Sequence, residues 1–303
     1  MIHIFIINPF AGEKNFADNL RSKLEEIPNL NYFVFNTRYR GYEAELVRKV
    51  RRMFEGEELR FYCCGGSGTM RNMLNGFDDI SKAEVAFFPC GLTNDFLKMF
   101  GDDEPRFSNI EELINGDVIK VDYIKTNHGI SLNTLSTGLD SNCVMKMNDF
   151  RILRYLGSAM PYTLATLYSI FVSKTLEYDI KFDNESIKAK YAEIFVGNGC
   201  VFGGNMFFAE NTCVNDGKAI LRLVGNKRGF PLLPILLAIT GRKFDKHEKI
   251  MLCRDCSKIS FCRSDGEAFT INQDGDLIKD VFYCEAEIVR KGLSFVVPKG
   301  VSL

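Results

Sequence analysis

A glycine-rich turn between a strand-like and a helix-like segment constrains the fold of this chain most strongly. Residues 59–64 form an apolar run typical of a buried strand, and residues 70–77 place apolar side chains at helical spacing. Between them stand Gly65, Gly66, Ser67, Gly68 and Thr69. Glycine lets the backbone approach a ligand closely, and a helix N-terminus presents free N–H groups and the positive end of its dipole. The run predicts a phosphate-binding loop, with a tight turn that binds nothing as the alternative.

Two common nucleotide-binding motifs do not fit this loop. A dinucleotide fingerprint needs a further glycine where Arg71 stands. A P-loop ends in Gly-Lys-Ser or Gly-Lys-Thr, and neither triplet occurs in the chain. The loop therefore belongs to a less common class of phosphate site.

Composition indicates a two-domain protein of ordinary charge. The chain has 303 residues, 46% of them hydrophobic, and a formal net charge of −1, which argues against nucleic acid as a partner. Residues 1–7 are apolar but short and lack a basic leader, so they predict a first strand and not a signal peptide. The apolar run 231–240 is too short to span a bilayer. We therefore expect a cytoplasmic protein.

The ten cysteines are scattered and many lie in apolar segments, which predicts reduced core residues in a chain without a secretory signal. Cys253 and Cys256, with Cys262 and His247 nearby, could form half of a zinc site. A single Cys-x-x-Cys pair lacks the second half that a structural zinc site needs, so zinc is disfavoured.

The first part of the chain alternates strand-like and helix-like segments. The strands are expected at residues 2–7, 31–36, 59–64 and 83–88, and the clearest helices at 16–27 and 43–54. This alternation is typical of a parallel sheet with crossover helices. Ligands bind at the carboxyl ends of such strands, so the loops starting at Asn8, Gly65 and Gly91 are expected to converge on one site.

After residue 121 the pattern changes to short strands separated by turn residues. They are expected at 123–135, 176–182, 191–197, 218–224, 258–261, 268–271, 282–288 and 293–297, interrupted by one helical segment at 150–174. Such spacing favours an antiparallel sandwich or barrel. We therefore expect an α/β domain over residues 1–122, a β-rich domain over 123–292, and a cleft between them.

Four spaced motifs, with two weaker ones, resemble those of the diacylglycerol kinase catalytic family, in particular its bacterial soluble lipid kinases. The four are Asn8-Pro9 with Gly12 and Lys14, Gly65 to Thr69 with Asn75-Gly76, the run Pro-Cys-Gly-Leu-Thr-Asn-Asp-Phe at 89–96, and Asp274-Gly275-Asp276 before Pro298. The weaker ones are Gly138-Leu139-Asp140, and Asn198-Gly199 with Gly203-Gly204 leading to Asn215-Asp216-Gly217. They span nearly the whole chain in the family's order.

The resemblance implies a nucleotide-binding α/β domain to which residues 293–303 return, and a β-rich substrate domain. It also implies transfer of the γ-phosphoryl group of ATP to a hydroxyl of a diacylglycerol-like lipid, with Mg²⁺ as a helper. Such transfer needs mainly positioning and neutralisation of charge. The nucleotide-binding residues that the resemblance implies are Asn8, Lys14, Thr37, Gly65, Gly66, Ser67, Gly68, Thr69, Thr93, Asn94 and Asp95.

The resemblance assigns the remaining site residues to catalysis, support and metal binding. Asp274 matches the general base that takes the proton from the lipid hydroxyl. Asp276 stands where the family usually has glutamate, and Asp140 matches a supporting charge network. Asp216, with backbone oxygens near Cys213 and Lys218, matches a structural magnesium site.

Each assignment has a structural alternative. Lys14 could be an ordinary loop lysine, and Asn94 with Asp95 could cap the next helix. The Asp274-Gly275 and Asp216-Gly217 pairs are also good hairpin turns. Function and structure are evenly balanced for Asp140.

Two positions depart from the family pattern: Ser67 replaces an aspartate and Leu92 replaces a threonine. Serine removes a negative charge, and a hydroxyl binds a divalent ion less well than a carboxylate. Two hypotheses follow, an active lipid kinase and a catalytically weak or inactive nucleotide- and lipid-binding pseudokinase. The kinase is favoured by four retained residues, Lys14, Asp95, Asp216 and Asp274.

The lipid acceptor is not specified by the sequence. The candidate lipid-contacting residues are Phe202, Met206, Phe207, Phe208 and the segment 230–237, with core packing as the alternative. Diacylglycerol, a sphingoid base and an undecaprenol-like alcohol all present a hydroxyl above an apolar tail. Peripheral contact with a membrane is expected, and a homodimer is left open.

Overall fold

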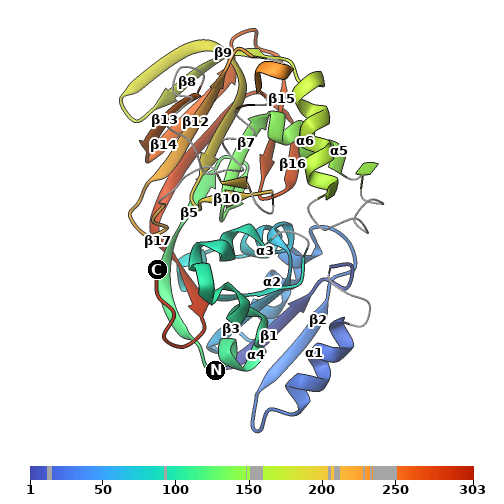
Figure 1. The fold of residues 1–303 in the computed structure, drawn as a ribbon. Coiled ribbons are helices and arrows are strands. Elements are labelled where there is room, and N and C mark those ends of the chain that lie inside the picture. The colour runs from blue at the N-terminus through green and yellow to red at the C-terminus, as the bar shows by residue number, and fades with distance from the viewer. Residues whose placement is uncertain are drawn as a thin grey trace. The chain divides into compact units, whose positions relative to one another are not determined.

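The computed structural model divides the chain into two compact units, which are described separately (Figure 1). Unit 1 comprises Met1–Val121 and Lys291–Leu303, and unit 2 comprises Asp122–Arg290. The structure describes residues 1–11, 16–91, 94–147, 149–150, 160–203, 206–207, 212–227, 229–232, 234 and 251–303.

Unit 1 is built on a parallel sheet, as the alternation of strands and helices predicts. Its strands are β1 (Ile2–Ile7), β2 (Tyr32–Asn36), β3 (Leu59–Gly65), β4 (Glu84–Pro89) and the end of β17 (Cys284–Val297), in the order β2-β1-β3-β4-β17. Its helices are α1 (Phe16–Glu25), α2 (Tyr42–Met53), α3 (Ser67–Leu74) and α4 (Ile110–Ile114), with the 3₁₀ segments η1 (Ile80–Lys82) and η2 (Asp95–Ser108).

Burial in unit 1 follows from the two-sided cover that crossover helices give a parallel sheet. Residues 4–7 of β1 are fully buried, and α2 turns Leu46, Val47 and Val50 inward. Gly76 lets α2 approach the end of α3, because a Cβ there would lie 2.7 Å from the Cβ of Val47. The fold of unit 1 therefore follows from apolar strands with one close helix contact.

Unit 2 is an antiparallel assembly with two helices against it (Figure 1). Its strands are β5 (Asp117–Thr126) from Asp122 on, β6 (Gly129–Ser131), β7 (Thr134–Gly138), β8 (Leu176–Phe182), β9 (Glu185–Gly197), β10 (Val201–Phe202), β11 (Met206–Phe207), β12 (Ala219–Gly225), β13 (Met251–Cys256), β14 (Lys258–Arg263), β15 (Phe269–Gln273), β16 (Asp276–Val281) and the start of β17. The helices are α5 (Leu139–Met147) and α6 (Met160–Val172), with the 3₁₀ turn η4 (Phe230–Leu232).

The sequence-based strands differ from the structure in several places. The strands β10, β11, β13 and β16 were not expected, and β9 begins at Glu185, six residues before the expected strand. The expected strand 123–135 is broken into β5, β6 and the start of β7, because Thr126 and Gly129 pair across a turn at Asn127 and His128. The expected strands 282–288 and 293–297 form one strand, β17. Burial in β17 alternates near Cys284, where it pairs antiparallel with β14, and is continuous beyond Gly292, where it pairs parallel with β4.

Candidate functional site

Four loops of unit 1 leave the sheet at the same edge. Ile7 is in register with Asn36 on one side and with Cys64 on the other, and Gly65 is in register with Pro89. The segments that follow β1, β2, β3 and β4 therefore start at the carboxyl ends of adjacent parallel strands, where ligands bind in sheets of this kind.

Asn8 joins two of these loops. Its Nδ2 donates to Thr69 Oγ1 at 3.0 Å, and its Oδ1 accepts the Phe10 N–H at 3.0 Å. Its own N–H donates to the carbonyl of Cys64 at 2.9 Å. Thr37 is buried at the same edge, and its N–H donates to the carbonyl of Ile7 at 2.8 Å. Asn8, Thr37 and Thr69 are thus brought together around the strand ends.

The glycine run ends β3 and begins α3, as predicted. Gly66 is the N-cap of α3, with no side-chain cap and no acidic residue in the first turn. The Met70 N–H donates to the Gly66 carbonyl at 3.0 Å, which leaves the amides of Ser67, Gly68 and Thr69 in the first turn. This N-terminus carries the positive end of the helix dipole and faces the strand ends.

Close packing accounts for Gly65 and Gly91, whose φ angles are not positive. A Cβ on Gly65 would lie 2.5 Å from the Cβ of Thr69, and a Cβ on Gly91 would collide with the Cα of Gly66. The N–H groups of Cys90 and Gly91 both donate to the Gly65 carbonyl, at 3.0 and 3.1 Å. The loops after β3 and β4 therefore lie directly against each other.

Asn94 and Asp95 stand at the start of η2. Asn94 Nδ2 donates to the Gly91 carbonyl at 3.2 Å, and its side chain makes no capping bond to η2. Asn94 Oδ1 is buried and has no hydrogen-bond partner among the described residues. Asp95, the next residue in the sequence, is also buried. A buried amide oxygen with a neighbouring carboxylate is a donor set that suits Mg²⁺, a hard cation.

Two predicted nucleotide-binding residues, Lys14 and Thr93, lie outside the described residues, as do Gly12 and Leu92. The structure therefore bears on Asn8, Thr37, the run from Gly65 to Thr69, Asn94 and Asp95 only. All of these belong to unit 1.

Asp274 lies in unit 2, at the tip of the hairpin between β15 and β16. Asp274 and Gly275 have φ angles of 50° and 90°, so the two-residue turn requires positive φ at both positions. The Asp274 carboxylate accepts backbone N–H groups from Leu132 at 2.6 Å, Thr134 at 2.7 Å and Asn133 at 3.1 Å. Burial raises the pKa of Asp274, and these N–H donors oppose that rise. The carboxylate is therefore held rigidly over residues 132–134.

Asp140 is the centre of a buried hydrogen-bond network in unit 2. Its Oδ2 accepts Ser136 Oγ and Asn272 Nδ2, both at 2.6 Å, and its Oδ1 accepts the Tyr162 hydroxyl. Asn272 Oδ1 in turn accepts the Gly275 N–H at 2.9 Å. Asp140 is thereby connected to the turn that carries Asp274. Asp276 is buried on the far side of that turn.

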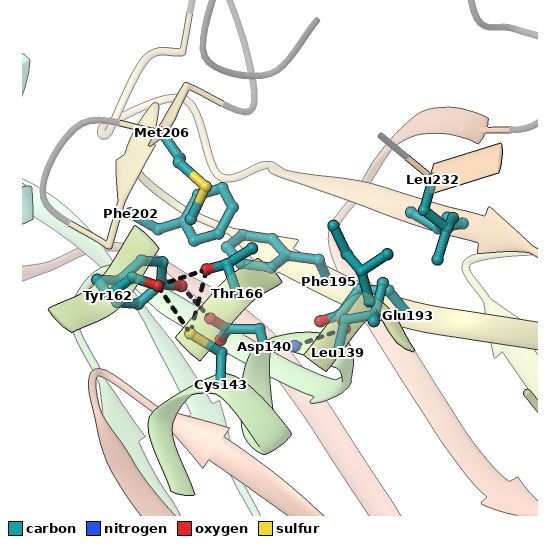
Figure 2. Close-up of a pocket in the computed structure, with 12 residues that line it drawn as sticks. Leu139, Asp140, Cys143, Tyr162, Thr166, Glu193, Phe195, Phe202, Met206 and Leu232 are labelled. Atoms are coloured by element: carbon teal, nitrogen blue, oxygen red, sulfur yellow. Dashed lines mark hydrogen bonds between the residues drawn. The ribbon is translucent and has the colours of Figure 1, made fainter. Parts of the chain in front are cut away.

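A largely apolar pocket opens beside this network, entirely within unit 2 (Figure 2). Its empty volume is about 550 Å³. The lining residues are Leu139, Asp140, Cys143, Tyr162, Thr166, Ile170, Glu193, Phe195, Phe202, Met206, Val224 and Leu232. Phe202 and Met206, two candidate lipid-contacting residues, are in this wall, whereas Phe208 lies outside the described residues.

Glu193 is a pocket residue that the sequence analysis missed. It lies on β9 and is 6% exposed, and burial raises its pKa well above the usual range. The signal was present in the sequence, because Glu193 is an acidic residue inside the apolar run 191–197. The run by itself indicates only a buried strand, and the pocket beside Glu193 forms only where α5 and α6 pack near it.

The predicted structural magnesium site is a turn in unit 2. Asp216 Oδ1 accepts the Lys218 N–H at 2.9 Å, and Cys213 Sγ donates to Asn215 Oδ1 at 3.0 Å. Asp122 Oδ2 accepts the Gly217 N–H at 2.6 Å, which holds the turn against β5. A metal here would be held by Asp216 and backbone oxygens.

Other metal and membrane features were sought over the described ranges. In that part of the chain, no group of three or more His, Cys, Asp or Glu side chains could hold a metal ion. All ten cysteines are free, and Cys253 is exposed whereas Cys256 is buried. His247 lies outside the described residues. No helix in the described ranges has the length and apolar character needed to cross a membrane.

Two family models match the chain, one in each half. Residues 3–126 match the diacylglycerol kinase catalytic domain, and residues 133–286 match the YegS C-terminal NAD kinase beta sandwich-like domain. The second match alone covers about half of the chain.

Curated relatives carry lipid kinase names. A "putative lipid kinase" of Staphylococcus carnosus is 27% identical over 52% of this chain and 51% of its own length. The "putative lipid kinase YtlR" of Bacillus subtilis is 34% identical over 32% of each chain. A "probable lipid kinase YegS-like" of Shewanella frigidimarina is 24% identical over 64% of this chain and 63% of its own. The chain thus spans about a third to just under two thirds of the length of these relatives.

Solved structures share the fold over nearly the whole chain. A diacylglycerol kinase from Bacillus anthracis str. Sterne superposes with a TM-score of 0.70 at 18% identity, over 99% of this chain and 98% of that one. A second structure from the same organism, described as a putative diacylglycerol kinase, gives a TM-score of 0.72 at 19% identity, over 97% and 96%. With both family models matched in order, the chain belongs to the diacylglycerol kinase catalytic-domain family, and it carries the YegS-type β-sandwich-like second domain.

Proposed function

We propose that this protein is an ATP-dependent lipid kinase that transfers the γ-phosphoryl group to the hydroxyl of a diacylglycerol-like lipid. The observation that carries the proposal is the uncapped N-terminus of α3 at the carboxyl edge of a parallel sheet, in a chain of this family. First-turn amides without a side-chain cap, together with the helix dipole, favour a phosphate at that place.

The nucleotide would bind along the strand ends of unit 1. The amides of Ser67, Gly68 and Thr69 would contact its phosphates, and Asn8 would hold Thr69 in place through its 3.0 Å hydrogen bond. Lys14 and Thr93 are proposed as further nucleotide ligands on the resemblance alone. Since phosphoryl transfer depends on positioning and charge neutralisation, rigid amides are suitable groups.

Asn94 Oδ1 and the Asp95 carboxylate would hold the magnesium ion that accompanies the nucleotide. The ion would neutralise part of the charge that develops on the phosphates. Asp216, with backbone oxygens near Cys213 and Lys218, is proposed as a second, structural magnesium site away from the transfer.

Asp274 is proposed as the general base for the lipid hydroxyl. A raised pKa makes its carboxylate a better proton acceptor than an ordinary aspartate, which supports this role. When Asp274 takes the proton, its carboxyl group becomes neutral and accepts weaker hydrogen bonds from the amides of Leu132 and Thr134, which lie at 2.6 and 2.7 Å. These amides therefore favour the return of Asp274 to its charged form, with release of the proton, after transfer.

The acceptor's apolar part would occupy the pocket of unit 2 (Figure 2). The walls are apolar with a few polar groups, which is typical of a small-molecule site. Contact with a membrane surface is supported by exposed apolar residues on α6 and η4, namely Leu167, Tyr168, Phe171, Val172 and Phe230. We place the protein in the cytoplasm, bound peripherally to the membrane; a homodimer stays a prediction.

The proposal is tested with γ-labelled ATP and a mixed lipid extract, using the wild type and Ser67→Asp. A kinase yields a labelled lipid with the wild type, and Ser67→Asp changes the rate because it adds a carboxylate at the phosphate loop. Failure of both proteins to label any lipid, while both bind ATP, contradicts the kinase and supports the pseudokinase.

A further inference from the structure

One side of the Glu193 carboxyl group is engaged and the other is not. Glu193 Oε2 accepts the Asp140 N–H at 2.9 Å, at the N-terminus of α5. The Leu139 N–H also bonds this carboxyl group. Glu193 Oε1 is buried and has no hydrogen-bond partner among the described residues. The side chain lines the apolar pocket, next to Leu139 and Asp140 (Figure 2).

The described residues that line the pocket around Glu193 include an acid and no basic side chain. The buried Arg222 of β12 is opposite Phe195, and its Nη1 donates to Met251 Sδ at 3.5 Å. The polar or titratable residues that line the pocket with it are Asp140, Cys143, Tyr162 and Thr166, and the lining set includes no Lys, Arg or His. Burial is the main cause that raises the pKa of Glu193, and the charge of Asp140 adds to it. A buried carboxylate without a cation is costly. Burial and the nearby Asp140 therefore favour the protonated form of Glu193.

Two backbone N–H groups at the start of α5 act against this rise in the pKa of Glu193. They donate hydrogen bonds to its carboxyl group and so stabilise the anion. A positive charge beside Oε1 would therefore stabilise the anionic form of Glu193 further. A ligand hydroxyl would complete the hydrogen bonding but would leave the charge uncompensated. A ligand ammonium would supply both.

We propose that this pocket selects a long-chain lipid with a protonated amine, whose ammonium group contacts Glu193 Oε1 while its chain lies along Phe195, Phe202 and Met206. The proposal rests on the proposed function in treating this pocket as the acceptor site, and it replaces the diacylglycerol-like acceptor with a hydroxyl lipid that also carries an amine. On binding, neutral Glu193 gives its proton to the solvent, and the resulting carboxylate pairs with the ammonium. No other bond forms or breaks.

The test is isothermal titration calorimetry of the full-length protein, without nucleotide, against octylamine and octan-1-ol. The two probes share a chain length and differ in the head group. Octylamine is expected to bind at least about tenfold more tightly, the size of effect typical of a charge-assisted hydrogen bond. Its heat should depend on the ionisation enthalpy of the buffer, because a proton is released, whereas that of octanol should not.

Glu193→Gln is the diagnostic variant and Glu185→Gln, an exposed residue of the same strand, is its matched control. Gln keeps the shape of the neutral acid, so octanol binding should be unchanged while the amine preference and the proton release are lost. Glu185→Gln should behave as the wild type. Equal affinities for both probes, or an amine preference that survives in Glu193→Gln, would mean that the pocket takes a neutral lipid.

Binding of neither probe would overturn the pocket as a ligand site. Failure of this inference is distinguishable from failure of the proposed function, because no ATP is present. Lipid phosphorylation without an amine preference overturns the inference alone. An amine preference without phosphorylation overturns the kinase alone.

Discussion

Asn272 connects Asp140 to the turn that carries Asp274. Its Nδ2 donates to Asp140 Oδ2 at 2.6 Å, and its Oδ1 accepts the Gly275 N–H at 2.9 Å. Asp140 belongs to α5, whereas Asn272 belongs to β15. A single buried amide thus fixes the position of the proposed base relative to the pocket wall within unit 2.

Replacing Asn272 with alanine is expected to destabilise unit 2. The change leaves the buried Asp140 carboxylate with one donor fewer and the Gly275 N–H without its acceptor, at a cost of about 1–3 kcal/mol. Urea denaturation followed by circular dichroism measures this. Asn226→Ala, at an exposed position, is the control and should cost less than about 0.5 kcal/mol. Equal midpoints for the two variants would show that the bridge is not stabilising.

Replacing Asp274 with asparagine tests the proposed base. Asn accepts the positive φ that this turn requires, so the hairpin is kept, but the group no longer takes a proton. Phosphoryl transfer is expected to fall by roughly 10²–10⁴-fold, the range for loss of general base catalysis, with ATP binding unchanged. Asp280→Asn is a matched control, since Asp280 also has positive φ and is exposed. Retained transfer in Asp274→Asn, measured with labelled ATP, would assign Asp274 a structural role only.

Replacing Gly91 with alanine tests the contact between the loops after β3 and β4. The added Cβ collides with Gly66, so the amides at the start of α3 have to shift. Affinity for ATP should fall by about tenfold or more, because phosphate contacts tolerate little displacement. Titration of a fluorescent ATP analogue measures this. Gly266→Ala is the control: its φ of 75° strains its own turn, but the position lies in unit 2 and a Cβ there meets no atom within 4 Å, so the affinity for ATP should be unchanged. The proposed phosphate site is wrong if Gly91→Ala also leaves the affinity unchanged.

His3 gives unit 1 a pH dependence. Burial first, and then the Arg60 charge, lower its pKa from 6.5 to about 4, and its Nδ1 lies 2.8 Å from the Tyr62 hydroxyl. The unfolded chain therefore binds a proton that the folded chain does not, between these two values. The stability of the wild type should fall as pH falls from 6.5 to about 4. Urea denaturation of His3→Gln across this range should show a smaller fall. An identical pH slope for both proteins contradicts the lowered pKa.

Much of the frame of the molecule can be predicted from the sequence. The parallel sheet follows from strand, loop and helix alternation, and the tight connection between β3 and α3 follows from the three glycines at their junction. The reason for these glycines could not be predicted, because Gly91 and Gly66 lie 25 positions apart and meet only through the pairing of β3 with β4. The position of the glycine loop could therefore be predicted from the sequence, its packing could not, and its binding of phosphate stays a prediction.

The pocket and the Asp274 environment could not be predicted. In the sequence, Glu193 is an acidic residue within an apolar strand, and only the structure shows that an amide of α5 binds its carboxyl group. Asp274 was expected as a general base, with a hairpin turn as the alternative, and the three amides of residues 132–134 that hold its carboxylate could not be predicted. Both features depend on segments more than 50 residues apart, as the Asp140–Glu193 separation of 53 and the Asp274–Leu132 separation of 142 show.

The most direct test of the lipid kinase is to follow the γ-phosphate itself. The wild-type protein is incubated with a lipid extract and ATP whose γ-phosphate carries heavy oxygen, and the lipids are analysed by mass spectrometry. The account predicts a phosphorylated lipid that carries the heavy label with the wild type and Asp280→Asn and that is strongly reduced with Asp274→Asn. Labelled inorganic phosphate alone, or no labelled product while ATP is bound, would contradict it.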